Sequence, residues 1–328
     1  MDKLQKFFFI SIVFLLLVGC GEKVSPVEMN IVRFDKILFS LNHEHPDIKT
    51  ISSDDYPFFN MYAIGVLQMP DVNSPEFPEL LSLFLTDSTI NIINDSVEHA
   101  YPQMDMQERE LSSAFGYYKH YFPFATLPKV YSCISGLNQS IITDSVMIGI
   151  GLDNYLGEDY IFYRLLAEPV PKYIRKKMTA NHIVRDVIYG WLTASYPFHP
   201  EKLDLISGMI YQGKICYLME KLLPAYSQER IFNFDKTQLH WCKDNEVEMW
   251  EFLLSGELIF NNTPFVLNKY LNDAPFSSGM PQESPGRAVV WSGYRIIRQY
   301  VDNSGASLSD LMQEQDYHKI LRLSKYRP

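Results

Sequence analysis

The apolar positions of residues 203–224 predict one long buried helix. They recur at intervals of three and four residues, and the apolar arc is too wide for a helix with one face in water. Pro200 precedes the segment and Pro224 ends it. Gln212 is the polar exception inside the stripe, and a buried amide without partners costs about 1–3 kcal/mol. We therefore expect this helix to pack centrally, and another part of the fold to supply hydrogen bonds to Gln212.

The same helical period predicts further helices on both sides of the central one. The expected segments are 58–69, 76–86, 105–122, 181–195, 236–255, a long helix from Ser284-Pro285, and a short pair opened by Ser307. Ser284 is the expected N-cap, with Pro285 in the first turn. Residues 236–255 contain a second polar exception, because Glu246 falls in an otherwise apolar stripe.

Two runs of β type interrupt the helices. They are VYSCISGL and VMIGIGLDNYL, within residues 127–163, and Thr143-Asp144-Ser145 between them could turn a hairpin. Strands do not alternate with helices, so a doubly wound fold is not expected. The order of helices, hairpin and helices predicts an α+β fold, a mostly helical single domain with a small antiparallel sheet.

The N-terminus has the pattern of a lipoprotein signal. A short basic stretch precedes an apolar run that is too short to span a bilayer comfortably. The run ends in the sequence LVGC, which resembles a bacterial lipobox, and Cys20 is then the acylated residue; an ordinary signal peptide with an incidental cysteine is the alternative. We expect a signal peptide over 1–19, a lipidated tether over 20–30 and one globular domain over 31–328. Membrane lipid is thus a partner through Cys20, with two or three acyl chains giving stable anchoring.

Charge and cysteine content narrow the function classes. The net charge is −10, so the chain is a poor candidate for binding nucleic acid. With 47% hydrophobic residues it can bury a sizeable core. Cys133, Cys216 and Cys242 follow Cys20 without a CxxC motif, which argues against a metal–thiolate site. Cys216 and Cys242 fall at core-facing helix positions, where they are expected to be small buried hydrophobes.

Motifs for catalysis are absent from the sequence. There is no GxSxG, Walker A or GxGxxG motif, and His43 and His45 lie in a polar stretch without a third ligand nearby. No cofactor and no metal are expected. Lys214 is predicted to be solvated on the outer face of its helix, and Tyr217 to be a core aromatic with a hydrogen-bonded tip.

The constellation of greatest interest is Gln212, Glu246 and Arg287. Two of these polar residues interrupt apolar stripes, and an arginine can answer a carboxylate and still donate to an amide. We predict that the three form one hydrogen-bonded network. It is either purely structural or the floor of a groove, near Tyr217 and Lys214, that binds a peptide or a glycan.

Five segments carry a family resemblance. They are IVRFDKILF (31–39), LPKVYSCISGLN (127–138), GIGLDNYLGEDYIFY (149–163), MIYQGKICYLMEKLLP (209–224) and SPGRAVVWSGYRIIRQYV (284–301). In order and spacing they resemble the gliding-motility lipoprotein B (GldB) family of the Bacteroidetes. The resemblance implies a lipid-anchored protein of the cell envelope, on the outer membrane facing the periplasm. Its implied partners are envelope proteins of the gliding and type IX secretion machinery.

A more distant resemblance is to predicted zinc peptidases, in which one helix bears HExxH and an EG-containing helix supplies a third ligand. This chain has no HExxH: His182 stands alone with Asp186 four residues on, and Gln212 replaces the glutamate. The resemblance implies a peptidase-like scaffold, with a degenerate zincin-like core, that lacks the zinc chemistry. The leading hypothesis is a non-catalytic protein that binds or assembles envelope partners. The alternative is a hydrolase with a rebuilt site that acts on peptide or peptidoglycan.

Overall fold

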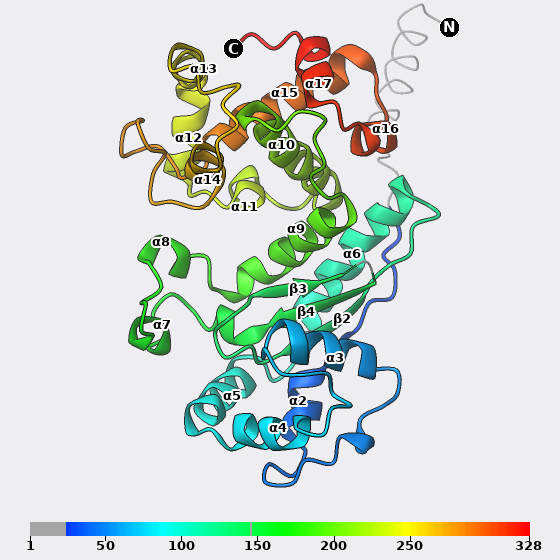
Figure 1. Ribbon diagram of the computed structural model, residues 1–328. Coiled ribbons are helices and arrows are strands. Elements are labelled where there is room, and N and C mark those ends of the chain that lie inside the picture. The colour runs from blue at the N-terminus through cyan, green and yellow to red at the C-terminus, as the bar shows by residue number, and fades with distance from the viewer. Residues whose placement is uncertain (1–23, 145) are drawn as a thin grey trace, which may run out of the picture.

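The computed structural model describes residues 24–144 and 146–328 (Figure 1). The expected signal peptide and Cys20 lie outside these residues. Helices dominate and one small sheet joins them, which confirms the prediction of a mostly helical α+β fold. No helix in the described part of the chain is both long enough and apolar enough to cross a bilayer.

In the described residues, the first half of the chain contains the helices α2 to α6 and the sheet. The helices are α2 (Phe34–Phe39), α3 (Tyr56–Gly65), α4 (Phe77–Thr86), α5 (Ser88–Ala100) and α6 (Asp105–Tyr121). The strands are β1 (Ile31–Arg33), β2 (Lys129–Cys133), β3 (Ile141–Thr143) and β4 (Met147–Gly151). Short 3₁₀ turns lie at η1 (Ile48–Thr50), η2 (Leu152–Tyr155) and η3 (Ala180–His182).

The described residues of the second half form helices joined by irregular loops. Its helices are α7 (Phe162–Leu165), α8 (Lys172–Arg175), α9 (Ile183–Ser195), α10 (Leu205–Leu222), α11 (Gln228–Phe232), α12 (Lys236–Asp244), α13 (Glu246–Ser255), α14 (Pro264–Leu271), α15 (Val289–Ser304), α16 (Leu308–Gln313) and α17 (Tyr317–Ser324). The final short pair begins as predicted, since Ser307 forms a capping box with Asp310.

The sheet is mixed, with strand order β1-β2-β4-β3. A hairpin turns at Asp144, whose Oδ1 accepts hydrogen bonds from the backbone amides of Val146 and Met147, but it joins β3 to β4. The hairpin predicted between the runs VYSCISGL and VMIGIGLDNYL was wrong, because the first run forms β2 and β3 was not recognised as a strand. The wholly antiparallel sheet was wrong, because β2 pairs in parallel with both β1 and β4. Both β2 and β4 are buried along most of their length. Strands that are buried on both faces are typical of parallel pairing, and the two outer strands β1 and β3 were both missed in the sequence.

Side chains alternate between two apolar clusters across the sheet. Tyr131 faces the helices α2 to α4, whereas Val130 and Ile148 face α9 and α6. Phe58 of α3 stacks on Tyr131 with ring centroids 4.1 Å apart. A side chain at Gly149 would come within 2.8 Å of the Phe58 ring, so the glycine permits this packing. Figure 1 shows α2 to α5 on one side of the sheet, α9 on the other, and the helices from α10 onward beyond α9.

Helix α10 is central, as the apolar pattern predicted. Most of its residues are buried, and it packs against α9, α15 and α17. Gly213 and Gly293 form the crossing point with α15. A Cβ at Gly213 would come within 2.3 Å of the Gly293 carbonyl carbon, and one at Gly293 within 1.9 Å of the Met209 carbonyl oxygen. The two backbones therefore touch, and only glycine fits at the contact.

The helix expected over 58–69 ends at Gly65, and two further wrong boundaries bear on the site. The expected helix over 236–255 breaks at Asn245, which separates α12 from α13. The last long helix begins at Val289, and Ser284 is not its N-cap. The Ser284 hydroxyl instead donates to the Pro281 carbonyl and accepts from the Ser277 amide, so it stabilises a turn that precedes the helix. As a result, Glu246 begins the separate helix α13, and Arg287 lies in the loop before α15. The sequence analysis had placed these two residues in one network.

Candidate functional site

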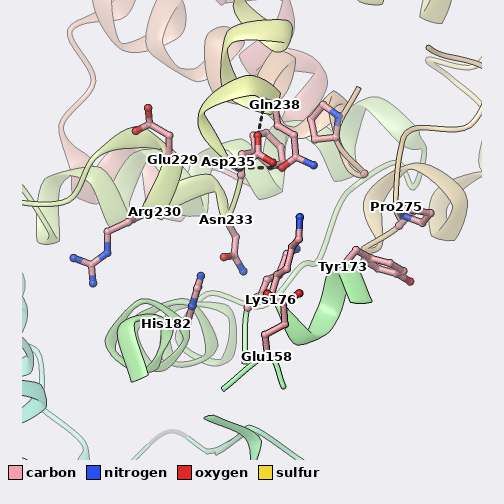
Figure 2. Close-up of a pocket in the computed structure, with 15 residues that line it drawn as sticks. Glu158, Tyr173, Lys176, His182, Glu229, Arg230, Asn233, Asp235, Gln238 and Pro275 are labelled. Atoms are coloured by element: carbon pink, nitrogen blue, oxygen red, sulfur yellow. Dashed lines mark hydrogen bonds between the residues drawn. The ribbon is translucent and has the colours of Figure 1, made fainter. Parts of the chain in front are cut away.

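A polar groove lies between α8 and α9 on one side and α11, α12 and the loop 273–287 on the other. It consists of two adjoining cavities of about 470 Å³ and about 300 Å³, which share Lys177 and Asn233. Figure 2 shows the larger cavity, with His182 and Lys176 facing Asn233 across it. These volumes lie in the usual range of ligand sites. We call the two cavities together the groove.

The inner end of the groove meets the central helix. Gln212 of α10 accepts two hydrogen bonds at its Oε1 atom, one from the Tyr189 hydroxyl at 2.6 Å and one from Arg287 Nη2 at 3.1 Å. The prediction that Arg287 answers the buried amide of Gln212 is therefore confirmed. Tyr189 and Arg287 line the smaller cavity, and Gln212 holds both of them in place.

Arg287 has donors to spare. Its side chain is 12% exposed, and its Nη1 atom lies 3.6 Å from Asp273, too long for a hydrogen bond. The buried Nε atom has no partner in the described part of the chain. The backbone of Arg287 is left-handed, with φ 64°, a conformation that costs a non-glycine residue about 1–3 kcal/mol. Strain of this kind is concentrated at functional sites, so we take Arg287 as the centre of the candidate site.

A second pair of charges lies beside Arg287. Lys177 Nζ is 2.9 Å from Asp273 Oδ1. Burial lowers the pKa of Lys177, although Asp273 acts in the opposite direction. Burial would raise the pKa of Asp273, but Lys177 and Arg287 outweigh it and hold that pKa below its usual value. Asp273 thus stays ionised and partly neutralises two cations.

Arg185 of α9 supplies a third cation to the smaller cavity. Its guanidinium lies 4.6 Å from the centre of the Tyr189 ring and 3.0 Å from Asp186 Oδ1. Its Nε and Nη2 atoms both donate to the Ile231 carbonyl. Asp186 in turn accepts from the Tyr155 hydroxyl at 3.1 Å. All three nitrogens of this guanidinium therefore make a hydrogen bond, whereas within the described residues only Nη2 of Arg287 does so.

Arg185 and Tyr189 are spaced four residues apart on α9, on the face that meets Gln212. In the peptidase pattern, two histidines at this spacing would meet the glutamate of the neighbouring helix. In this chain the same spacing on α9 carries Arg185 and Tyr189 in place of histidines, and Tyr189 contacts Gln212. Two guanidinium groups repel a divalent cation, so this donor set does not fit zinc. Within residues 24–144 and 146–328, no group of three His, Cys, Asp or Glu side chains could hold a metal ion.

His182 lies at the start of α9, in the larger cavity. Its Nδ1 atom is 2.8 Å from the Thr179 hydroxyl, and burial lowers the pKa of its imidazole. It is the residue that precedes the helix, as predicted. It contributes to the wall of the groove.

Glu246 does not belong to the Gln212–Arg287 pair, so the three-residue network was wrong. Its carboxylate accepts from Arg295 Nε at 3.0 Å, from the Trp291 indole at 3.3 Å and from the Tyr326 hydroxyl at 2.9 Å. The break at Asn245 places Glu246 in the first turn of α13, and Arg295 lies about two turns beyond Arg287 along the chain.

Lys214 and Tyr217 lie outside the groove. The predicted solvated position of Lys214 was wrong: its side chain is fully buried under α16 and α17. Its Nζ atom donates to the Glu314 carbonyl at 2.9 Å and to the Met312 carbonyl at 3.4 Å. Burial lowers the pKa of Lys214 to about 8. Tyr217 is a buried aromatic, 6.3 Å from Tyr294 between ring centroids.

Sequence reasoning missed Lys177, Arg185, Tyr189 and Asp273. The available signal was the spacing of Arg185 and Tyr189 on a helix whose apolar side had been recognised. Lys177 and Asp273 lie in irregular segments 96 residues apart, and no local pattern connects them. The prediction that Cys216 and Cys242 are buried is confirmed, and Cys133 is buried as well; all three are free.

Comparison with known proteins gives one match that covers nearly the whole chain. A family model described as gliding motility protein GldB matches residues 21–328. Curated proteins and solved structures return no match.

Proposed function

Because the chain belongs to the gliding motility protein GldB family, we propose that it acts as a non-catalytic component of the gliding and type IX secretion machinery in the cell envelope. In this proposal it is a pseudoenzyme that is anchored to the outer membrane through an acylated Cys20 and faces the periplasm. Its groove binds a polypeptide segment of an envelope partner. The family supports a lipoprotein of gliding motility; the site supports the binding role.

The observation that carries the binding role is the set of uncommitted donors on Arg287. A guanidinium has five N–H groups, and Arg287 uses one of them in a hydrogen bond, to Gln212. The residue is held in a strained backbone conformation at the edge of a 300 Å³ cavity. A carboxylate is the group that such a fork binds best, in a bidentate manner. We infer that a carboxylate of the bound polypeptide, from a side chain or a C-terminus, pairs with Arg287.

The groove also suits an extended polypeptide. Tyr173, Phe234 and Pro275 offer apolar contacts in the larger cavity, and Asn233 and Gln238 offer amides. Peptide sites combine apolar contact with a few fixed polar groups in this way. Tyr189 and Arg287 line the smaller cavity, where they can contact the segment without cleaving it.

Photo-cross-linking in cells tests this proposal. Tyr173 is half-buried at the groove, so a benzoylphenylalanine in its place should capture the bound segment. Leu83 of α4 is 63% exposed and lines neither cavity of the groove, so the same replacement there is the matched control. We expect one defined adduct with an envelope protein from position 173 and none of that adduct from position 83. Absence of an adduct at 173, or the same adduct from both positions, would contradict a groove-bound partner.

The anchor has a separate test. Cys20→Ser should abolish labelling by palmitate and leave the precursor uncleaved by the lipoprotein signal peptidase. Palmitate labelling that persists in Cys20→Ser would show that Cys20 is not the site of acylation.

A further inference from the structure

Phe124 is the most exposed large apolar side chain in the described part of the protein. It is 100% exposed, in the loop that follows α6. A single exposed apolar residue is ordinary on a soluble surface. Two features distinguish Phe124 from an ordinary exposed residue. The loop around it is held by hydrogen bonds, and the N-terminal segment runs along α6 toward it.

The loop that carries Phe124 is held by hydrogen bonds on both sides of it. Lys119 Nζ donates to the Pro123 carbonyl at 2.7 Å and to the Ala125 carbonyl at 2.9 Å. The Ala125 amide donates to the Phe122 carbonyl, and the Phe122 ring packs 4.7 Å from that of Tyr118. Phe122 therefore turns inward while Phe124 points into solvent from a rigid frame.

The segment that follows the expected lipid runs along α6 toward this loop. The Ile31 amide donates to Glu108, and the Val27 amide donates to the Ser112 carbonyl at 3.1 Å. One turn further along α6, a Cβ at Gly116 would come within 2.5 Å of the Ser25 carbonyl oxygen. Residues nearer the N-terminus thus contact positions nearer the C-terminal end of α6.

The distance from there to the expected lipid is short. Cys20 precedes Ser25 by five residues, which reach at most about 18 Å. The remaining part of α6, from Gly116 to Tyr121, is about 8 Å long. An acylated Cys20 can therefore enter the membrane level with Phe124.

We infer that the end of α6 faces the lipid surface and that Phe124 inserts into the boundary between headgroups and acyl chains. This inference rests on the proposed lipid anchor. Tyr117 and Tyr121 are half-buried on the same part of α6, and tyrosines favour this interfacial zone. The covalent lipid supplies the affinity, and Phe124 fixes the orientation of the domain. Figure 1 shows α8, at the groove, on the opposite side of the view from α6, so this orientation leaves the groove free for a partner.

The test uses the full, lipidated chain with a single reactive thiol. Cys133, Cys216 and Cys242 are buried, so Phe124→Cys introduces the thiol that an environment-sensitive nitrobenzoxadiazole dye can label. Leu83→Cys, on the other side of the sheet, is the matched control. Both are reconstituted into phosphatidylethanolamine and phosphatidylglycerol vesicles, with and without lipids that carry a shallow nitroxide quencher.

We expect the dye at position 124 to shift its emission to the blue and to be quenched by the shallow nitroxide, and the dye at position 83 to behave as in water. A water-like signal at 124 in protein that floats with the vesicles would overturn the membrane-facing loop and leave the anchor intact. Equal quenching at both positions would overturn it as well, because the domain would then have no preferred orientation. Failure of the full chain to float would refute the anchor, and the inference with it.

Discussion

Helix α10 contributes to two buried cationic centres that differ in one respect. At the first, Lys214 is fully buried and directs its ammonium to the carbonyls of Met312 and Glu314, above the Tyr317 ring. At the second, Gln212 holds Arg287, whose Nε atom has no partner in the described residues and whose side chain lines a cavity. The first centre is closed, and the second is open to a ligand.

The difference shows how a structural charge can be distinguished from a binding charge. A buried ammonium that is enclosed by carbonyls and an aromatic face has few donors left. A guanidinium that is placed beside a cavity, with donors free and a strained backbone, keeps part of its capacity for another molecule. Burial alone does not distinguish a structural cation from a binding cation. The number of its N–H donors that already make hydrogen bonds does.

The largest expected effect is on stability at the closed centre. Lys214→Ala should lower the free energy of unfolding by about 2–4 kcal/mol, because it leaves a cavity and two carbonyls without a donor. Lys214→Met also leaves the two carbonyls without a donor but fills most of the volume, so it should cost about 1–2 kcal/mol, less than Lys214→Ala. Urea unfolding of both variants measures these changes. A loss of less than about 0.5 kcal/mol in Lys214→Ala would indicate a solvated side chain, as the sequence had predicted.

The depressed pKa of Lys214 makes the same centre sensitive to pH. Its pKa is about 8 in the fold and about 10.4 in the unfolded chain, so between these values the unfolded state binds more protons. Stability must therefore rise with pH, by about 2 kcal/mol from pH 7 to 9.5 for this group. The buried Cys216 and Cys242 thiols, whose pKa burial raises, act in the opposite direction.

Comparison of the wild-type protein with Lys214→Met cancels the cysteine contribution, because both proteins carry the same thiols. We expect the free energy of unfolding of the wild-type protein to increase relative to that of Lys214→Met as the pH rises over this window. A difference between the two that does not change with pH would show that Lys214 titrates normally.

At the open centre, the left-handed backbone of Arg287 predicts a reversal of the usual order of two substitutions. Arg287→Gly should be more stable than Arg287→Ala by about 1 kcal/mol, because glycine adopts φ 64° without steric cost. Elsewhere in a fold, alanine is normally the more stable of the two. Chemical denaturation of both proteins measures the difference, and an alanine variant as stable as the glycine variant would argue against strain at this position.

The smallest effect concerns Gln212. Gln212→Glu restores the carboxylate of the peptidase pattern and keeps an oxygen for Tyr189 and Arg287, so stability should change by less than about 1 kcal/mol. Arg185 and Arg287 remain close, and we expect purified Gln212→Glu to contain far less than one zinc per chain by elemental analysis. Stoichiometric zinc in this variant or in the wild-type protein would support the hydrolase hypothesis.

Features that follow from the periodic spacing of apolar residues could be predicted from the sequence. The apolar arc of α10 located the central helix, and the amide of Gln212 inside it required a partner, which Arg287 provides. The pattern could not show that α16 and α17 cover Lys214, because that contact joins residues about a hundred positions apart. The pattern also could not show that the helix breaks at Asn245, so that Glu246 pairs with Arg295 and not with Arg287. Helix α5 was also missed, since it buries only Ile93, Asn94 and Val97.

The most direct test of the account removes each of the two cations and measures partner capture at the groove. Benzoylphenylalanine at position 173 is combined with Arg287→Gly or with Lys214→Met, and the adduct is normalised to the amount of folded protein. We predict that Arg287→Gly lowers the yield about tenfold or more, the loss expected for a charge-assisted hydrogen bond, and that Lys214→Met leaves it unchanged. Equal yields in the two variants would contradict the assignment of Arg287 as the binding cation.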